Sequence, residues 1–212
     1  MSIGSKLGGQ CRKPEGWMGR FFLWAMNSGH SKLTDWGLEQ ISIDPHGKIL
    51  DIGCGGGRTV SKLAGITVEG KVYGIDYSET SVASARRNNA RFIKMGRVEI
   101  RLGSVSELPF PDNTFDLVTA VETHFFWPNL SSDLREVLRV LKPGATLVII
   151  AEAYKGAKTM NEKVAEKVVQ ATGMTLLTIQ EHKEVLERSG YSDVRIIEQP
   201  DKGWICALGK KV

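Results

Sequence analysis

Short apolar runs alternate with segments of helical periodicity from residue 48 to residue 153, a pattern that few folds accommodate. We expect five strands, at 48–53, 71–76, 98–103, 115–121 and 145–153. One helix is predicted over 132–141, and Lys142-Pro143-Gly144 should stop it. Another begins near Ser78 and carries Val82, Ala85 and Phe92 on one face. This alternation predicts a parallel sheet with helices on both faces.

The C-terminal part of the chain departs from the alternation of strands and helices. Thr178 and Glu181 form a predicted capping box for a helix over 179–189, which Gly190 closes. Strands follow at 193–198 and 203–209, and the turn between them is too short for a crossover helix. The predicted fold is therefore a Rossmann-like, doubly wound α/β sheet of seven strands, mostly parallel with an antiparallel C-terminal strand.

Composition excludes several protein classes. The chain has 212 residues, which suits one domain, and no apolar run is long enough to span a membrane. The first residues lack the apolar core of a signal peptide, so we expect a cytoplasmic location. Three scattered cysteines predict neither a disulfide framework nor a metal site. The net charge of +4 is spread along the chain, so no nucleic-acid partner is expected.

The sequence Gly53-Cys54-Gly55-Gly56-Gly57 follows the first strand, where doubly wound sheets hold their ligands. A phosphate-binding P-loop is excluded because no Gly-Lys-Ser/Thr closes the loop. A dinucleotide loop fits poorly, since Arg58 replaces the third glycine of G-x-G-x-x-G and Asp51 precedes the loop. A plain glycine-rich turn remains an alternative.

The motif of Asp51, Gly53, Gly55 and Gly57 resembles the class I S-adenosylmethionine-dependent methyltransferases, in which an acidic residue precedes G-x-G-x-G. The segments "GSVSELPFPDNTFDLVTAV" (103–121) and "LREVLRVLKPGATLVI" (134–149) resemble the same family. The resemblance is strong over residues 47–153 and is nearest to the ubiquinone- and menaquinone-biosynthesis branch, whose members methylate diverse small molecules. It implies S-adenosylmethionine as cofactor.

The resemblance also implies roles for individual residues. Asp51 helps to hold the ammonium group, the glycines allow close backbone approach, and Cys54 packs against the ligand. Asp76, at the end of the second strand, accepts bonds from the ribose hydroxyls, unless it only caps the next helix. The remaining cofactor contacts are expected from Tyr77, Ser104, Val105 and Val121. Ser104 departs from the family, which has an acidic residue there.

The methyl acceptor is expected beyond the fourth strand, at "VETHFFWPNL" (121–130). His124 is the candidate base or polar anchor, and Trp127 and Tyr154 are candidate pocket walls. Alternatively, His124 bonds a loop and Trp127 packs under the 132–141 helix. The segment lacks the motifs of nucleic-acid base methyltransferases and the cysteines of arsenite methyltransferases. We therefore predict a small-molecule acceptor.

Two further segments complete the expected organisation. Residues 1–46 are rich in aromatic side chains and predict a helical lid, with Trp24 and His30 near the acceptor; simple packing on the sheet edge is the alternative. Residues 47–212 form the core, with a helical insert at about 154–178. Two other functions stay open, an NAD-dependent oxidoreductase and a non-catalytic S-adenosylmethionine-binding protein.

Overall fold

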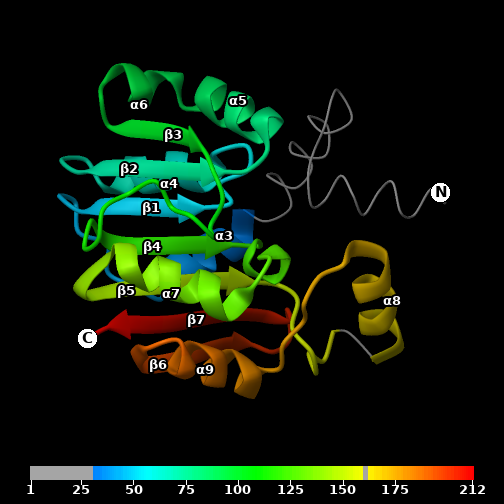
Figure 1. The fold of residues 1–212 in the computed structure, drawn as a ribbon. Coiled ribbons are helices and arrows are strands. Elements are labelled where there is room, and N and C mark those ends of the chain that lie inside the picture. The colour runs from blue at the N-terminus through cyan, green and yellow to red at the C-terminus, as the bar shows by residue number, and fades with distance from the viewer. Residues whose placement is uncertain (1–30, 160–161) are drawn as a thin grey trace.

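One seven-stranded sheet forms the centre of the molecule, with the strand order β3-β2-β1-β4-β5-β7-β6 (Figure 1). The computed structural model describes residues 31–159 and 162–212, so the predictions for residues 1–30, including Trp24 and His30, lie outside the described residues. The strands are β1 (Lys48–Ile52), β2 (Lys71–Asp76), β3 (Val98–Leu102), β4 (Phe115–Val121), β5 (Leu141–Ala151), β6 (Tyr191–Gln199) and β7 (Trp204–Lys211).

Strand pairing confirms the predicted topology. The four neighbouring pairs among β1 to β5 are parallel, whereas β7 runs antiparallel to both β5 and β6. The direction of the strand order reverses between β1 and β4. From β1 the chain adds β2 and β3 on one side, and from β4 it adds β5 on the other side. In such sheets a crevice opens at the carboxyl ends of the two central strands.

The start of β5 differs from the prediction. Helix α7 (Leu130–Val140) ends one residue early, and β5 already begins at Leu141. Leu141 is fully buried and pairs with Phe115, and the pairing then shifts to Leu117 with Thr146. Residues 142–145 therefore form a bulge, in which Gly144 adopts a positive φ of 79°. Lys-Pro-Gly ends the helix as expected, but it lies inside the strand.

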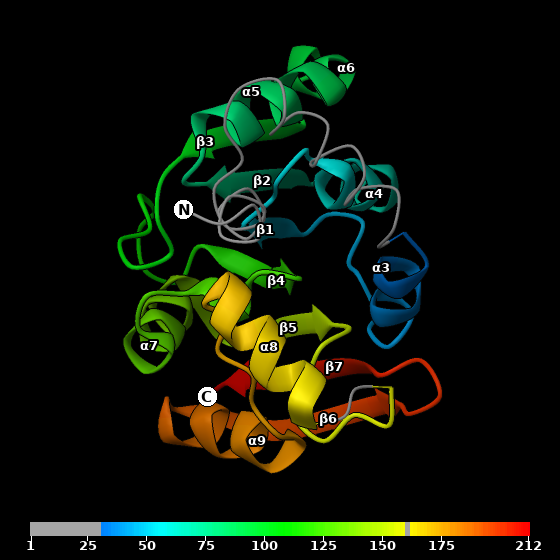
Figure 2. The same cartoon turned by 90° about the vertical axis from the view of Figure 1, so that its right-hand side faces the viewer.

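Helices cover both faces of the sheet (Figure 2). On one face, α3 (Ser31–Leu38), α4 (Arg58–Ile66) and α5 (Glu79–Asn88) contribute Leu33, Leu63 and Val82 to a common apolar cluster. On the other face, α7 and α9 (Ile179–Arg188) contribute Leu134 and Leu186 to a second cluster. Side chains of successive strand residues alternate between these two clusters, as the pleat requires.

Local signals set the helix ends. Ser78 caps α5, Thr178 and Glu181 form the predicted capping box of α9, and Gly190 follows that helix with a φ of 100°. One prediction needs correction, because α5 stops at Asn88 and Phe92 belongs to a separate helix, α6 (Ala90–Lys94). The intervening Asn89 turns its side-chain amide back to the Ala85 carbonyl, which ends α5.

The predicted insert contains helix α8 (Glu162–Thr172). Figures 1 and 2 place α8 beyond the carboxyl ends of the parallel strands, apart from the helices that cover the sheet faces. Within residues 31–159 and 162–212, no helix combines the length and apolar character that a membrane span needs.

Candidate functional site

A cavity of about 340 Å³ lies at the carboxyl ends of β1, β2 and β4. It brings together residues from the ends of three strands and from the connection after β3. Six predicted site residues line it: Gly53, Asp76, Tyr77, Ser104, Val105 and Trp127. The cavity therefore occupies the crevice that the strand order creates.

The glycine loop leaves β1 in a conformation that ordinary residues avoid. Gly53, Gly55 and Gly57 have φ values of 67°, 52° and 79°. A Cβ atom at Gly53 would collide with the Thr123 side chain, and one at Gly57 would lie 2.9 Å from the Ala85 Cα atom. The three spaced glycines thus meet a requirement of the backbone, and Gly53 and Gly57 also meet one of close packing. Gly53 alone of the three lines the cavity.

Asp76 organises the loop from the neighbouring strand. Its carboxylate accepts hydrogen bonds from the backbone N–H groups of Gly55 and Ser78, each at 2.9 Å. Burial raises the pKa of Asp76, while these two N–H donors oppose the rise. Asp76 is therefore no simple helix cap, since Ser78 caps α5 and Asp76 joins the cap to the glycine loop.

Asp51 lies deeper than Asp76 and does not line the cavity. Its side chain is only 2% exposed and accepts a 2.7 Å hydrogen bond from the Thr119 hydroxyl on β4. Burial raises the pKa of Asp51 to about 7, against the lowering effect of this bond. Cys54 is also buried, and burial followed by the charges of Asp76 and Asp51 raises the pKa of its thiol. This thiol is a packing group rather than a nucleophile.

Two asparagines at the end of α5 support the loop, and neither was predicted. Asn88 donates to the Gly56 carbonyl and Asn89 donates to the Gly57 carbonyl, each at 2.9 Å. Asn89 is fully buried. A pair of adjacent asparagines near a predicted helix end was the available signal, because asparagine amides often bond backbone groups that a helix end leaves unpaired.

The segment after β4 forms another wall of the cavity. Thr123, Phe126 and Pro128 line it beside Trp127, and none of these three was predicted. Glu122 has a left-handed φ of 57°, which turns the chain sharply where the strand ends. Val121, the last residue of β4, does not line the cavity.

His124 points away from this cavity. It is 2% exposed, and its Nε2 lies 3.0 Å from Nε2 of His182 on α9. The Nδ1 atom of His182 lies 2.8 Å from the Thr178 carbonyl and therefore donates to it. A neutral His182 then accepts at Nε2, so His124 donates. Burial, and then His182, hold the pKa of His124 well below its usual range.

The two predicted walls lie in different places. Trp127 lines the cavity and also packs among the residues under α7, so both interpretations of this residue describe part of its surroundings. Tyr154 is buried in a separate cluster with Phe125 and Ile205, and its hydroxyl contacts Glu198 at 3.2 Å. It does not line the cavity.

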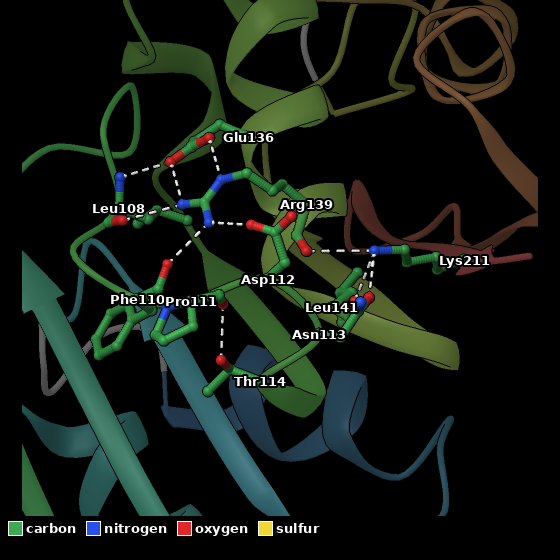
Figure 3. Close-up of polar contacts among 10 residues, drawn as sticks. All are labelled: Leu108, Phe110, Pro111, Asp112, Asn113, Thr114, Glu136, Arg139, Leu141 and Lys211. Atoms are coloured by element: carbon green, nitrogen blue, oxygen red, sulfur yellow. Dashed lines mark hydrogen bonds and ion pairs between the residues drawn. The ribbon is translucent and has the colours of Figure 1, made fainter.

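The connection after β3 carries Ser104 and Val105 to the cavity and contains no helix. Figure 3 shows how α7 holds its distal part, where Glu136 and Arg139 contact the backbone at Leu108 and Phe110. Lys211, near the end of β7, donates to Asn113 Oδ1 at 2.8 Å at the far end of this connection. The cavity wall is therefore fixed by elements distant in the sequence.

Comparison with known proteins agrees with this architecture. Residues 50–149 match the family model described as a methyltransferase domain. A demethylmenaquinone methyltransferase of Symbiobacterium thermophilum is 38% identical over 117 residues, which cover 55% of this chain and 46% of that protein. The chain is thus similar to methyltransferases over residues 50–149, and it spans about half the length of the curated relatives it matches.

Solved structures share the fold across most of the chain. A SAM-dependent methyltransferase from Aquifex aeolicus has a TM-score of 0.74 at 23% identity, with 90% of this chain and 97% of that chain covered. The geranyl diphosphate C-methyltransferase from Streptomyces coelicolor also has a TM-score of 0.74, at 14% identity, with 86% and 79% covered. The chain therefore shares the Rossmann-like fold of these proteins.

Proposed function

We propose that this protein transfers a methyl group from S-adenosylmethionine to a small-molecule acceptor. The observation that carries the proposal is the crevice that Gly53 and Asp76 line, with two further left-handed glycines in the same loop and the buried Asp51 on β1. The methyltransferase family match supports it. A structural neighbour that contains S-adenosylhomocysteine supports the choice of cofactor.

The residues present fit this cofactor. Gly53 lines the cavity with bare backbone, where a Cβ atom would collide with Thr123, and Asp76 brings a carboxylate to the cavity wall. Asp51 would hold the ammonium group and Asp76 the ribose, while Tyr77, Ser104 and Val105 would border the adenine. Bound there, the cofactor would supply a methyl group activated on a sulfonium sulfur.

The protein's own contribution would be to orient the reactants and exclude water. Thr123, Phe126 and Trp127 would form the acceptor side of the cavity, where two aromatic rings favour an apolar or aromatic acceptor. His124 receives no catalytic role in this proposal, because it faces His182. The residues of the cavity wall therefore replace the predicted base as the acceptor-side candidates.

Ligand binding separates this proposal from its alternatives. We expect calorimetry to detect S-adenosylmethionine and S-adenosylhomocysteine binding, and no NAD binding, because Asp51 and Arg58 disfavour a dinucleotide. A screen of phenols, thiols, amines and quinol precursors should then release S-adenosylhomocysteine with one class. Tight NAD binding without the other two would overturn the assignment. Cofactor binding without turnover on any acceptor would favour a non-catalytic binding protein.

We further propose that residues 1–30 form a lid over the crevice. The described chain starts at Ser31, whose hydroxyl accepts a 2.8 Å hydrogen bond from Arg58 directly after the glycine loop. Residues 1–30 therefore join the described part next to the residue that follows the glycine loop. A variant that starts at residue 31 should lose at least about 10-fold in cofactor affinity if water exclusion matters. Unchanged affinity, in a variant with an unchanged melting temperature, would contradict the lid.

A further inference from the structure

The connection between β3 and β4, residues 103–114, forms part of the proposed cofactor site and contains no helix of its own. Its first residues, Gly103, Ser104 and Val105, line the cavity. Within the connection, Ser104 and Glu107 form an isolated antiparallel β-bridge. Backbone groups in such a segment need partners elsewhere, because buried and unpaired N–H and C=O groups are costly.

One turn of α7 provides these partners (Figure 3). Glu136 accepts the Leu108 N–H at 2.8 Å. Arg139 donates to the Leu108 carbonyl at 3.1 Å and to the Phe110 carbonyl at 2.8 Å. Arg139 also donates to Asp112 at 2.7 Å. The side chains of two residues, one turn apart, thus bind three backbone groups and one carboxylate of the connection.

The donors of Arg139 are fully used. Its remaining N–H groups bond both oxygens of Glu136, at 2.8 and 2.7 Å, so that five N–H groups make five bonds. Glu136 holds the guanidinium in the plane that reaches the connection, and Arg139 is the first cause of the lowered pKa of Glu136. A lysine has three donors in a different geometry and could not reproduce this arrangement.

The contacts continue from Leu108 to the cavity. Glu107 donates its N–H to the Ser104 carbonyl at 3.3 Å, and Ser106 donates to the Ser104 hydroxyl at 3.2 Å. This turn joins Ser104 to Ser106 and Glu107, and Glu107 directly precedes Leu108 in the chain. A displacement of Leu108 would therefore move Ser104 and Val105, although Arg139 itself does not line the cavity.

We propose that Arg139, held by Glu136, is a positioning residue that sets the adenine side of the cofactor site through residues 103–110. This inference rests on the proposed function. It predicts that Arg139→Lys raises the dissociation constants for S-adenosylhomocysteine and for adenosine by about 3- to 30-fold, the usual range for positions that act through a contact network. The matched control is Arg188→Lys on α9, whose arginine also pairs with a glutamate of its own helix, at 2.8 Å, but does not contact the connection.

Calorimetry gives these dissociation constants, at a temperature well below the melting transitions of the wild type and of both variants. Hydrogen exchange should also show faster exchange at the Leu108 amide in Arg139→Lys and no change there in Arg188→Lys. If Arg139→Lys does not fold, Glu136→Gln tests the same contacts, because it keeps an acceptor for Leu108 while it weakens the hold on Arg139.

The outcomes are distinguishable. Faster exchange with weaker ligand binding supports the inference. Faster exchange with wild-type affinity for both ligands overturns it and leaves the proposed function intact. If the wild-type protein binds neither ligand, the proposed function fails, and the assignment of Arg139 to a cofactor site fails with it. Equal weakening by Arg188→Lys would show a general loss of stability and would also overturn the inference.

Discussion

Asp51→Asn is expected to weaken S-adenosylmethionine binding and to stabilise the ligand-free protein. At about pH 8 the affinity should fall by about 10- to 100-fold, because a charge-assisted hydrogen bond contributes roughly 1.5–3 kcal/mol. The free energy of unfolding should rise by about 1–3 kcal/mol. Relief of the buried charge contributes roughly 4 kcal/mol for a pKa shift from 3.8 to about 7, and a new unpaired amide costs about 1–3 kcal/mol.

The pH dependence gives the sign of this effect. Because the pKa of Asp51 is raised on folding, the folded protein binds the proton more tightly than the unfolded chain. The contribution of Asp51 to stability is therefore fully present below about pH 4 and is lost as the pH rises to about 7. The stability advantage of Asp51→Asn over the wild type should therefore grow as the pH rises from about 4 to about 7. The affinity of the wild type for the cofactor should rise as the pH approaches and passes about 7, because the ammonium group of the cofactor needs the ionised carboxylate of Asp51.

Calorimetry and thermal unfolding between about pH 4 and about pH 8 would test both expectations. Asp116→Asn is the matched control, since Asp116 lies near the amino end of β4, away from the cavity, and pairs with Lys142 at 2.7 Å. The control should lose a little stability and keep the wild-type affinity. An Asp51→Asn variant that binds the cofactor like the wild type at about pH 8 would contradict the role of Asp51.

Gly57→Ala should remove cofactor binding and destabilise the fold. A left-handed φ of 79° costs alanine about 1–2 kcal/mol, and the new methyl group would lie 2.9 Å from the Ala85 Cα atom. With a further penalty of about 1–3 kcal/mol for overpacking, the free energy of unfolding should fall by about 2–5 kcal/mol. The loop and α5 would have to separate, which would also break the Asn89 bond to the Gly57 carbonyl.

Gly65→Ala, in the helix α4 that follows the loop, is the control for this variant. Gly65 is exposed, and an added Cβ atom would meet no other atom within 4 Å. This substitution should stabilise the protein by about 0.5–1 kcal/mol through helix propensity, with unchanged cofactor affinity. Urea unfolding and calorimetry on both variants give the comparison. Equal stability of Gly57→Ala and the wild type would contradict the packing argument at the loop.

The parts of the site that follow from local chemistry were predictable. Spaced glycines after an apolar run indicate positive φ values, and Gly53, Gly55 and Gly57 all have them. Ser78 and Thr178 were predicted as helix caps from neighbours within three residues, and both act as caps. Asp76 was predicted at the end of its strand, and the family resemblance implied its place in the ligand site; it lines the cavity there. These features depend on a few consecutive residues.

The acceptor side was less predictable because it depends on where the chain turns. The segment after β4 turns at Glu122, and a left-handed glutamate has no dependable sequence signal. That turn brings Thr123, Phe126 and Trp127 to the cavity and sends His124 toward His182, which is 58 residues away. Periodicity arguments fail for a turn of this length, because each side-chain direction follows from individual backbone angles.

The sequence by itself determined the doubly wound sheet, the glycine loop and the two carboxylates at its strand ends, because periodicity, caps and left-handed glycines are properties of short segments. Only the tertiary structure decided which side chains support the loop and line the cavity. Asn89 reaches Gly57 across 32 residues, and Arg139 reaches Leu108 across 31. Such contacts depend on how distant elements pack, and no local pattern records that packing.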